Sequence, residues 1–567
     1  MSRLHRLLPF LNWPRLQGDL LKGEALAGLT VGLMVLPQGV AYAALAGMPL
    51  VTGIYASMLP ALAAVLFSSS VRLSVGPTAL TCLLIGAALN GLATPGSPEW
   101  VNLAVWLALL SGLLQIALGF MRFGWLLNLV NAPVLMAFTQ AAAFLIISSQ
   151  APALVGWNSA GTGGWVPQVH LPSLAFGLIS LALLLLARRW RPAFPSVLAI
   201  VLASAGASFL WGFEALGGRV VGPLPSGVPA LYWPSWPTAG VWGQLVLPTL
   251  VITLVSFLET ASSAKVDNER QGTRWNQDQD LIGQGLGKLA AGLSGAFATS
   301  SSFSRSALNL YAGARTGWAT VFSVVVVLVA LLVFTPVLRY VPQPVLAAIV
   351  VVAVLGLIKP RELPRLWRIS KVESTIALLT FGITLATAPQ LYWGVLAGVL
   401  MSLSHFLYQR LHPRIIEVGQ HADGRLRDRH LWQLPPIAPD TYALRMDAAL
   451  DFGSASALER AIGDHLSAHP DTRQVVWLAQ PVNSIDATGV DTFIRLRQTL
   501  AAQNRLLVVV GLKLPVERVL KAAGELRAED LTVRMYATET EAFNCLHTAT
   551  HQADTIQPSK GSKGGNP

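Results

Sequence analysis

The stretch SSSVRLSVGPTAL places small polar residues and a helix-starting signal inside otherwise apolar sequence. Gly76 is expected to cap a helix, and Pro77 suits the first helical position, where a missing N–H has no consequence. The backbone N–H groups of Thr78 and Ala79 are then left without partners inside the helix. Unpaired N–H groups at the positive end of a helix dipole favour a negatively charged ligand, so this stretch is a candidate anion site.

A second stretch, ATSSSFSRS, repeats this combination later in the chain. A serine at 301 or 302 is expected to be the N-cap of a helix, followed by the free N–H groups of Phe303, Ser304 and Arg305. The hydroxyls of Ser302 and Ser304 can donate hydrogen bonds to anion oxygens. Arg305 adds a full positive charge, and an ionisable group inside a membrane segment indicates function. The alternative is a loop arginine that faces the cytoplasm.

Three further polar residues lie in apolar runs. Gln38 and Tyr42 in LPQGVAYAALAG are four residues apart, so they share one helix face, and Pro37 frees a backbone carbonyl beside them. Both can donate hydrogen bonds to a ligand, and polar contacts between helices are the alternative. Glu259 lies deep in LVSFLETASSAK. Burial favours the neutral form of a carboxyl group unless a cation compensates, so Glu259 near Arg305 would make anion binding depend on protons. The alternative is a permanent structural Glu–Arg pair.

The sequence shows no motif that is typical of an enzyme. The nearest approach to a nucleotide-binding phosphate loop is GQGLGKLA, in which Ile282 occupies the position of the first glycine and Leu289 follows the lysine. HExxH, nucleophile-elbow and paired-carboxylate motifs are also missing. Cys82 and Cys545 are too few for a disulfide framework or a zinc site. We therefore expect no catalytic residue, no metal site and no cofactor, and any transport is secondary or passive.

The composition is that of a protein embedded in the lipid bilayer. Hydrophobic residues make up 53% of the 567 residues and charged residues only 12%, where a soluble domain has about 25% charged residues. The net charge of +11 does not indicate nucleic-acid binding, because most basic residues flank apolar runs of spanning length. The N-terminus has no signal-peptide cleavage pattern and is expected to form an interfacial helix.

The apolar runs predict about fourteen spans in two groups of about seven. They cover residues 24–45, 50–67, 77–90, 101–121, 125–147, 172–187 and 194–211, and then 243–264, 280–298, 303–313, 317–334, 343–358, 372–387 and 390–409. The third and tenth runs, which contain the two candidate anion stretches, are too short to cross roughly 30 Å of hydrocarbon. Short segments at matching positions of two halves indicate a transporter's binding site between inverted repeats. Re-entrant loops or packing seams are the alternative.

The basic residues predict the orientation of the spans. Connections after even-numbered runs carry Arg72, Arg122, Arg188, Arg189, Arg191, Lys265, Arg270, Arg274, Arg315, Lys359, Arg361, Arg365, Arg368 and Lys371. Connections after odd-numbered runs carry almost none, with Arg219 and Arg339 as exceptions. The positive-inside rule then places the N-terminus and the C-terminal region in the cytoplasm, with the spans in the inner membrane.

The sequence divides into four parts. We predict a cytoplasmic N-terminal segment at 1–22, a transmembrane domain at 23–411, a soluble domain at 412–548 and a disordered tail at 549–567. In the soluble part, QVVWLAQ and RLLVVVGL predict buried strands, while GSASALERAIGDHL and VDTFIRLRQTLAAQ predict amphipathic helices. This alternation is typical of a small α/β domain.

These segments together resemble the SulP family of sulfate permeases and anion transporters, relatives of the animal anion exchangers and prestin. The resemblance rests on LPQGVAYAALAGMPLVTGIYAS, SSSVRLSVGP, LETASSAK and DQDLIGQGLGKLAAGLSGAFATSSSFSRSALNLYAGART, in this order. MDAALDFGSA and NSIDATGVDTF resemble a STAS domain. The family implies a seven-plus-seven inverted repeat of core and gate domains, a homodimer, elevator-like movement of the core, and contact with a cytoplasmic partner at the STAS domain.

The resemblance also implies roles for single residues. Gln38 and Tyr42 match substrate contacts of the first span. Thr78 matches the third half-helix, and Ser304 and Arg305 match the anion contacts of the tenth half-helix.

Three other positions are informative in this resemblance. Glu259 matches an acidic position linked to proton coupling, whereas sodium-coupled bicarbonate members tend to carry aspartate in this neighbourhood. Gln140 stands where many relatives have glycine, which puts the substrate preference in doubt. Thr488 matches a residue that is phosphorylated in anti-sigma-factor antagonists, but DATG is expected rather to be a helix-capping loop used for packing or partner docking.

These observations predict proton-coupled uptake of a small oxyanion, most simply sulfate. Moving a dianion into a negative cell is opposed by roughly 4.6 kcal/mol per 100 mV, so uptake needs co-transported cations. Sodium-coupled bicarbonate uptake and C4-dicarboxylate uptake are alternatives. A nucleobase permease would want acidic residues at both half-helices, which Arg305 argues against. An anion sensor that signals through the soluble domain is a further class.

Overall fold

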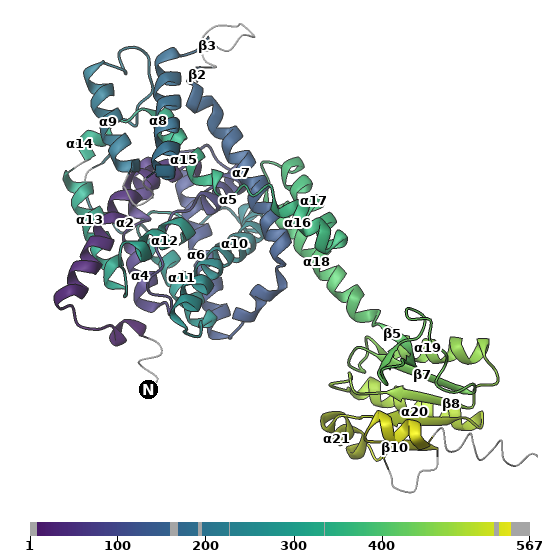
Figure 1. Ribbon diagram of the computed structural model, residues 1–567. Coiled ribbons are helices and arrows are strands. Elements are labelled where there is room, and N and C mark those ends of the chain that lie inside the picture. The colour runs from purple at the N-terminus through teal and green to yellow at the C-terminus, as the bar shows by residue number, and fades with distance from the viewer. Residues whose placement is uncertain are drawn as a thin grey trace, which may run out of the picture. The chain divides into compact units, whose positions relative to one another are not determined.

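The computed structural model describes residues 8–158, 168–190, 196–225, 227–333, 335–526 and 532–545. Its chain contacts divide it into two compact units, Met1–Ser402 and Leu403–Pro567 (Figure 1). The division falls inside helix α18 (Tyr392–Leu411), at whose end we predicted the boundary between the two domains. The predicted disordered tail at 549–567 lies outside the described residues.

The first unit is helical, with helices in all fourteen predicted runs. Its elements are η1 (Pro9–Asn12), α2 (Gly18–Leu45), α3 (Leu50–Tyr55), α4 (Leu59–Phe67), β1 (Val75–Gly76), α5 (Ala79–Leu89), α6 (Pro98–Phe120), η2 (Gly124–Leu129), α7 (Ala132–Val155), β2 (Trp157–Asn158), β3 (Gln168–Val169), α8 (Leu171–Trp190), α9 (Ser196–Leu210), α10 (Ala239–Gln271), α11 (Gln277–Leu293), β4 (Ser300–Ser301), α12 (Phe303–Tyr311), α13 (Trp318–Val333), α14 (Thr335–Leu338), α15 (Gln343–Leu355), α16 (Glu362–Ile369), α17 (Lys371–Ala386) and α18. Six of the described helical segments are long and apolar enough to cross a membrane. The seven-plus-seven repeat stays a prediction.

Two predicted boundaries differ from the structure. Residues 8–17 contain only the 3₁₀ turn η1, and α2 already begins at Gly18, so the described part of the N-terminal segment is not a separate interfacial helix. Pro14 accounts for this, because a proline has no N–H for a continuing helix. Helix α10 extends beyond the predicted 243–264, and at 33 residues it is about 50 Å long. It ends only at Gly272, whose φ of +63° is the left-handed conformation that closes helices.

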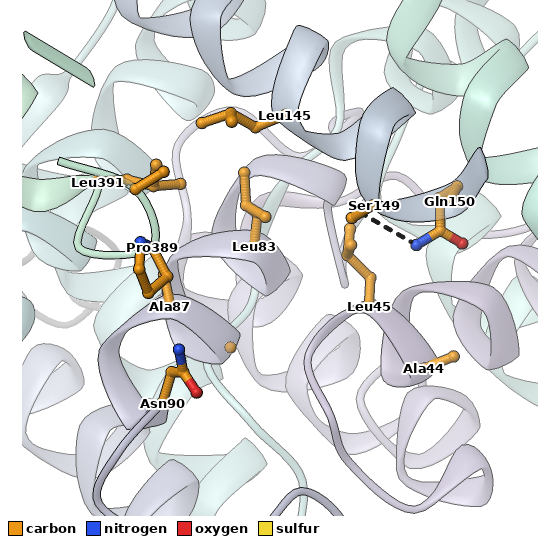
Figure 2. A pocket seen from close by; sticks show the side chains of 12 residues that line it. Ala44, Leu45, Leu83, Ala87, Asn90, Leu145, Ser149, Gln150, Pro389 and Leu391 are labelled. Carbon is orange, nitrogen blue, oxygen red and sulfur yellow. Dashed lines mark hydrogen bonds between the residues drawn. The ribbon is translucent and has the colours of Figure 1, made fainter. Parts of the chain in front are cut away.

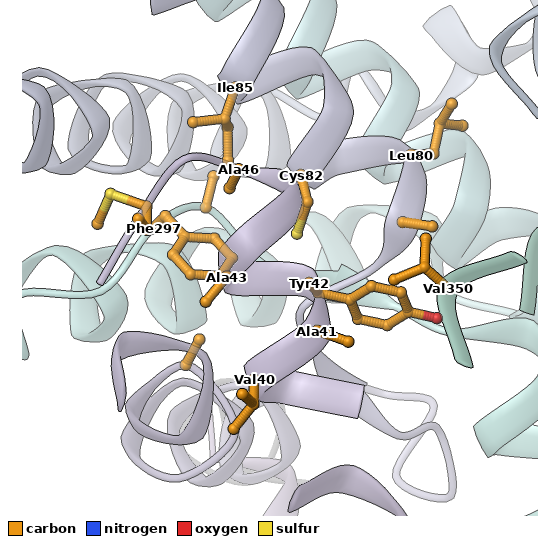
Figure 3. Close-up of a cluster of buried hydrophobic side chains, with 14 of the residues drawn as sticks. Val40, Ala41, Tyr42, Ala43, Ala46, Leu80, Cys82, Ile85, Phe297 and Val350 are labelled. Carbon is orange, nitrogen blue, oxygen red and sulfur yellow. The ribbon is translucent and has the colours of Figure 1, made fainter. Parts of the chain in front are cut away.

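An apolar core fills the space between the helices of the first unit. Figure 3 shows part of it, where side chains of α2 such as Val40 and Ala43 meet Leu80, Cys82 and others of α5. Small residues let helices approach closely: a Cβ on Gly53 would lie 1.9 Å from the Gly39 carbonyl oxygen.

The second unit is a six-stranded sheet with helices, as the alternating pattern predicts. Its strands are β5 (Ile415–Gln420), β6 (Leu426–Asp428), β7 (Thr441–Met446), β8 (Gln474–Leu478), β9 (Leu506–Val510) and β10 (Val533–Tyr536), in the order β10-β9-β8-β7-β5-β6. Strands β7 to β10 pair in parallel, and the helices are α19 (Ala455–Ala468), α20 (Ala487–Ala502) and α21 (Leu514–Ala522). Continuous apolar text in β8 and β9 fits strands that are buried on both faces.

Candidate functional site

Two short helices start from one crossover. Strands β1 and β4 pair in antiparallel fashion, with Val75 opposite Ser301 and Gly76 opposite Ser300. Helix α5 begins three residues after β1, and α12 begins two residues after β4. With 11 and 9 residues the helices are about 17 Å and 14 Å long, too short to span a bilayer. The ladder therefore brings the N-termini of two half-helices to one place, where the matching short runs predicted a binding site.

The first half-helix is capped differently from the prediction. Thr78, not Gly76, is the N-cap of α5, and its hydroxyl accepts a hydrogen bond from the N–H of Thr81 at 3.4 Å. Gly76 is not available as a cap because it is paired with Ser300 in the ladder. Ala79 is the first helical residue, so its N–H has no partner inside the helix. Thr78 thus contributes its side chain rather than a free helical N–H.

Glu259 of α10 contacts this cap. The Thr78 hydroxyl donates to Glu259 Oε2 at 2.9 Å, and the Thr81 hydroxyl donates to the same oxygen at 3.2 Å. Glu259 is only partly buried. Among the described residues no ion pair joins Glu259 to Arg305, so the permanent Glu–Arg pair is not observed. Neutral hydroxyls therefore hold this carboxyl group beside the crossover.

Arg305 of α12 lies inside the crossover with 1% of its surface exposed, so it is not a loop arginine facing the cytoplasm. Its Nη1 donates to the Pro77 carbonyl oxygen at 2.9 Å, and its Nε donates to Ser74 Oγ at 3.4 Å. Nη2 is buried without a hydrogen-bond partner. A Cβ on Gly76 would lie 3.2 Å from Nη2, so the glycine leaves room for this end of the guanidinium group. A buried cation with an unused donor is the strongest anion-binding feature of the site.

The start of α12 is open to solvent. Ser302 is the N-cap, as predicted, but its side chain makes no capping hydrogen bond. Phe303 is 57% exposed and Ser304 is exposed. The hydroxyls of Ser302 and Ser304 lie 3.3 Å apart. Free N–H groups and two hydroxyls can therefore face a ligand here.

Gln38 and Tyr42 lie on α2 and are each 5% exposed. Gln38 Oε1 is buried without a hydrogen-bond partner. The Tyr42 ring lies among apolar side chains next to Cys82 and Val350 (Figure 3). Arg305 contacts Pro77, Glu259 contacts Thr78, and Cys82 lies one turn further along α5, so the structure brings Tyr42, Arg305 and Glu259 to the start of α5. Gln140 lies on α7.

A cavity of about 490 Å³ lies at the other end of α5. Figure 2 shows it between the C-terminal parts of α2 and α5, helix α7 and the segment before α18. Its lining is mainly apolar, with Asn90, Ser149 and Gln150 as polar members. It contains none of the predicted site residues.

Sequence reasoning missed the groups that fix the stretch before β1. Asp280 of α11 is fully buried and accepts hydrogen bonds from the N–H and hydroxyl groups of Ser69 and Ser70 and from the indole of Trp275. Arg72 pairs with Asp267 of α10. The signal that could have identified them is the sequence DQDLIGQGLGK, whose polar residues overlap the start of a predicted span. Carboxylates of this kind anchor the loop that leads into the crossover.

In the second unit, Thr488 is exposed in the first turn of α20. The N-cap of this helix is Asp486, whose side chain accepts from the Gly489 N–H at 2.8 Å. Asp486 also accepts from the Phe452 N–H at 3.0 Å. DATG is therefore a capping loop, and phosphorylation of Thr488 stays a prediction.

Comparison with known proteins agrees with this architecture. The sulfate permease family model matches residues 21–380, and the STAS domain model matches residues 435–542. The chain is 31% identical to a "Probable sulfate transporter" of Mycobacterium tuberculosis, covering 92% of this chain and 95% of that one. It is 30% identical to "Sulfate transporter 4.1, chloroplastic" of Arabidopsis thaliana, covering 89% and 77%. The murine Solute Carrier 26 family member A9 anion transporter in the inward-facing state shares the fold, with a TM-score of 0.85, 19% identity and coverage of 96% and 94%.

Proposed function

Because the chain belongs to the sulfate permease family of transporters, we propose that it carries sulfate into the cell together with protons. The chain is an anion transporter and not an enzyme. The relatives that span nearly its whole length are named sulfate transporters, which supports sulfate as the substrate. The observation on which the proposal depends most is the buried Arg305 with its unpartnered Nη2 at the crossover.

The anion binds in front of α12. Arg305 supplies the charge, and the first N–H groups of α12 with the hydroxyls of Ser302 and Ser304 donate to the oxyanion. Gln38 and Tyr42 of α2 are the proposed contacts that limit the size of the ligand. Phe303, with its N–H at the first helical position, completes this surface.

Glu259 carries the proton. Uptake of a dianion against a negative interior needs accompanying cations, because the membrane potential opposes it by roughly 4.6 kcal/mol per 100 mV. Glu259 is held by hydroxyls and not by Arg305, so it can gain a proton while Arg305 stays charged for the anion. No cofactor takes part in this scheme, and protons rather than sodium are the coupling ion.

The remaining features of the scheme follow the same logic. The site residues lie on α2, α5, α10 and α12. Helices α2 and α10 each contact both α5 and α12. We propose that these four helices move as one elevator-like body against the other helices. The positive-inside rule places the second unit in the cytoplasm of a cell with an inner membrane, where it can contact a protein partner. We further propose that the protein acts as a homodimer.

Sulfate uptake into proteoliposomes with an inward proton gradient tests this proposal. The wild type is expected to take up radiolabelled sulfate faster with the gradient, and Glu259→Gln is expected to lose the stimulation. Glu269→Gln is the matched control, because Glu269 lies on the same helix but is exposed. Stimulation that survives in Glu259→Gln would overturn the coupling role.

The same preparation separates the other substrates. Absence of sulfate flux at any pH, with movement of bicarbonate or a C4-dicarboxylate instead, would overturn sulfate while leaving the anion site in place. If sodium and not protons stimulated sulfate uptake, sodium would be the coupling ion. Anion binding without any flux would favour a sensor.

A further inference from the structure

A fully buried lysine lies behind the candidate site. Lys288 of α11 has no exposed surface, and it belongs to the sequence GQGLGK, which does not match the phosphate-loop motif. Gly112 of α6 and Gly285 of α11 let the two helices approach closely, since a Cβ on Gly285 would lie 2.6 Å from the Gly112 carbonyl oxygen. A Cβ on Gly112 would lie 3.0 Å from Lys288 Cβ. This glycine seam encloses the lysine side chain.

The polar partners of Lys288 are neutral. Its Nζ donates to Ser256 Oγ on α10, and the Gln115 side-chain nitrogen donates to the same oxygen at 3.2 Å. Gln115 Oε1 is buried without a partner. Among the described residues no carboxylate forms an ion pair with Lys288. Burial without a counter-charge disfavours the charged form of a lysine, so an anion nearby would stabilise the protonated amine.

Lys288 is connected to the crossover through Ser256. The Ser256 carbonyl oxygen accepts a hydrogen bond from Ser300 Oγ at 2.8 Å, and Ser300 is paired with Gly76 in the ladder. Ser256 also lies three residues before Glu259, so both occupy one face of α10. Lys288 therefore holds the part of α10 that carries Glu259 and contacts the crossover.

We propose that Lys288 is the second positive charge of the anion site and makes it select divalent over monovalent anions. This inference deepens the proposed function and rests on it. A bound dianion stabilises the protonated form of Lys288, so that Arg305 and Lys288 then supply two positive charges. An ionised Glu259 cancels one of these charges. With a proton on Glu259, the two cations match one dianion. Lys288 is a positioning residue and does not touch the anion, because Ser256 and the β4 strand lie between them.

The test measures selectivity as well as rate. Radiolabelled sulfate uptake is inhibited with unlabelled selenate, a dianion, and with nitrate, a monoanion. In Lys288→Met the KM for sulfate is expected to rise about tenfold, and the selenate preference over nitrate to fall about tenfold, with little change in maximal rate. Lys288→Gln keeps a polar group and is expected to show the same loss, since both variants remove the charge.

Ser111→Ala is the matched control for packing. Ser111 is fully buried on α6 and donates to the Ala108 carbonyl oxygen of its own helix at 3.2 Å. It is expected to leave selectivity unchanged. A merely structural lysine would lower the uptake and inhibition of all anions together, with the selenate to nitrate ratio unchanged, and this result would overturn the inference.

The two proposals fail in different ways. If the wild type carries sulfate and both Lys288 variants keep the wild-type selenate to nitrate ratio, the role of Lys288 is wrong and the proposed function stands. If the wild type carries no sulfate, the proposed function itself is wrong, and the preference for dianions fails with it.

Discussion

The two half-helices share a crossover but expose their N-termini very differently. At α5 the cap is closed: Thr78 is buried, its hydroxyl binds Glu259, and Ala79 behind it is buried as well. At α12 the cap is open: Ser302 makes no side-chain cap, and Ser304 faces solvent. The two helices therefore start from the same strand pair but differ in the exposure and the contacts of their cap residues. The α12 end can bind the anion, while the α5 end holds Glu259, for which we propose the proton-coupling role.

The largest expected effect comes from removing the charge of α12. Arg305→Gln is expected to lower sulfate uptake about 100-fold or more, because its buried Nη2 is the unused donor of the site. Uptake in proteoliposomes checks this, with thermal unfolding in detergent to show that the variant folds. Arg339→Gln, which removes an exposed arginine, is the control. Near-normal uptake in Arg305→Gln would mean that the anion binds elsewhere.

A smaller effect is expected at the open cap. Ser304→Ala removes one hydroxyl donor and should raise the sulfate KM about threefold to tenfold, with proton stimulation intact. The measurement is the sulfate concentration dependence of uptake at two pH values. Loss of proton stimulation in this variant would contradict the assignment of anion binding to α12 and proton coupling to α5.

Sequence reasoning located this pair of helices but not the long-range contacts that surround them. The short runs, the Ser302 cap and the charge of Arg305 follow from local signals, because capping and span length depend on neighbouring residues. The Gly76 cap was wrong, since Gly76 pairs with Ser300 from a distant part of the chain and local sequence does not encode that pairing. The partners of Asp280 and Lys288 were missed for the same reason.

The closed cap should affect coupling and leave affinity intact. Thr81→Val removes a hydroxyl that donates to Glu259 while keeping the side-chain shape. The ionised carboxylate then loses a donor, so half-maximal proton stimulation is expected at higher pH, with the sulfate KM changed less than about twofold. Uptake across a pH series measures both quantities. An altered KM with an unchanged pH profile would assign the α5 end to the anion.

The smallest effect on transport is expected from the soluble unit, although it also responds to pH. The His465 ring stacks on Tyr442 at 3.6 Å and on His469 at 4.4 Å between ring centroids. Partial burial lowers the pKa of His465 below its ordinary value of 6.5, and the charges of His469, Arg429 and His430 add to this while Glu417 opposes it. The unfolded chain then takes up the proton first, so the stability of this unit falls as pH drops below about 6.5.

His465→Phe keeps the aromatic stack and removes this titration. In the wild type, the backbone amides of β7 and α19 are expected to lose protection from hydrogen exchange as the pH falls, and in His465→Phe this loss should be smaller. Proton-stimulated sulfate uptake by the full-length chain is expected to stay unchanged. The reason is that we propose Glu259, beside the closed cap of α5, as the residue that binds the proton driving uptake. If His465→Phe abolished the stimulation, the pH dependence of transport would belong to the soluble unit, and the contrast between the two half-helices would concern anion binding alone.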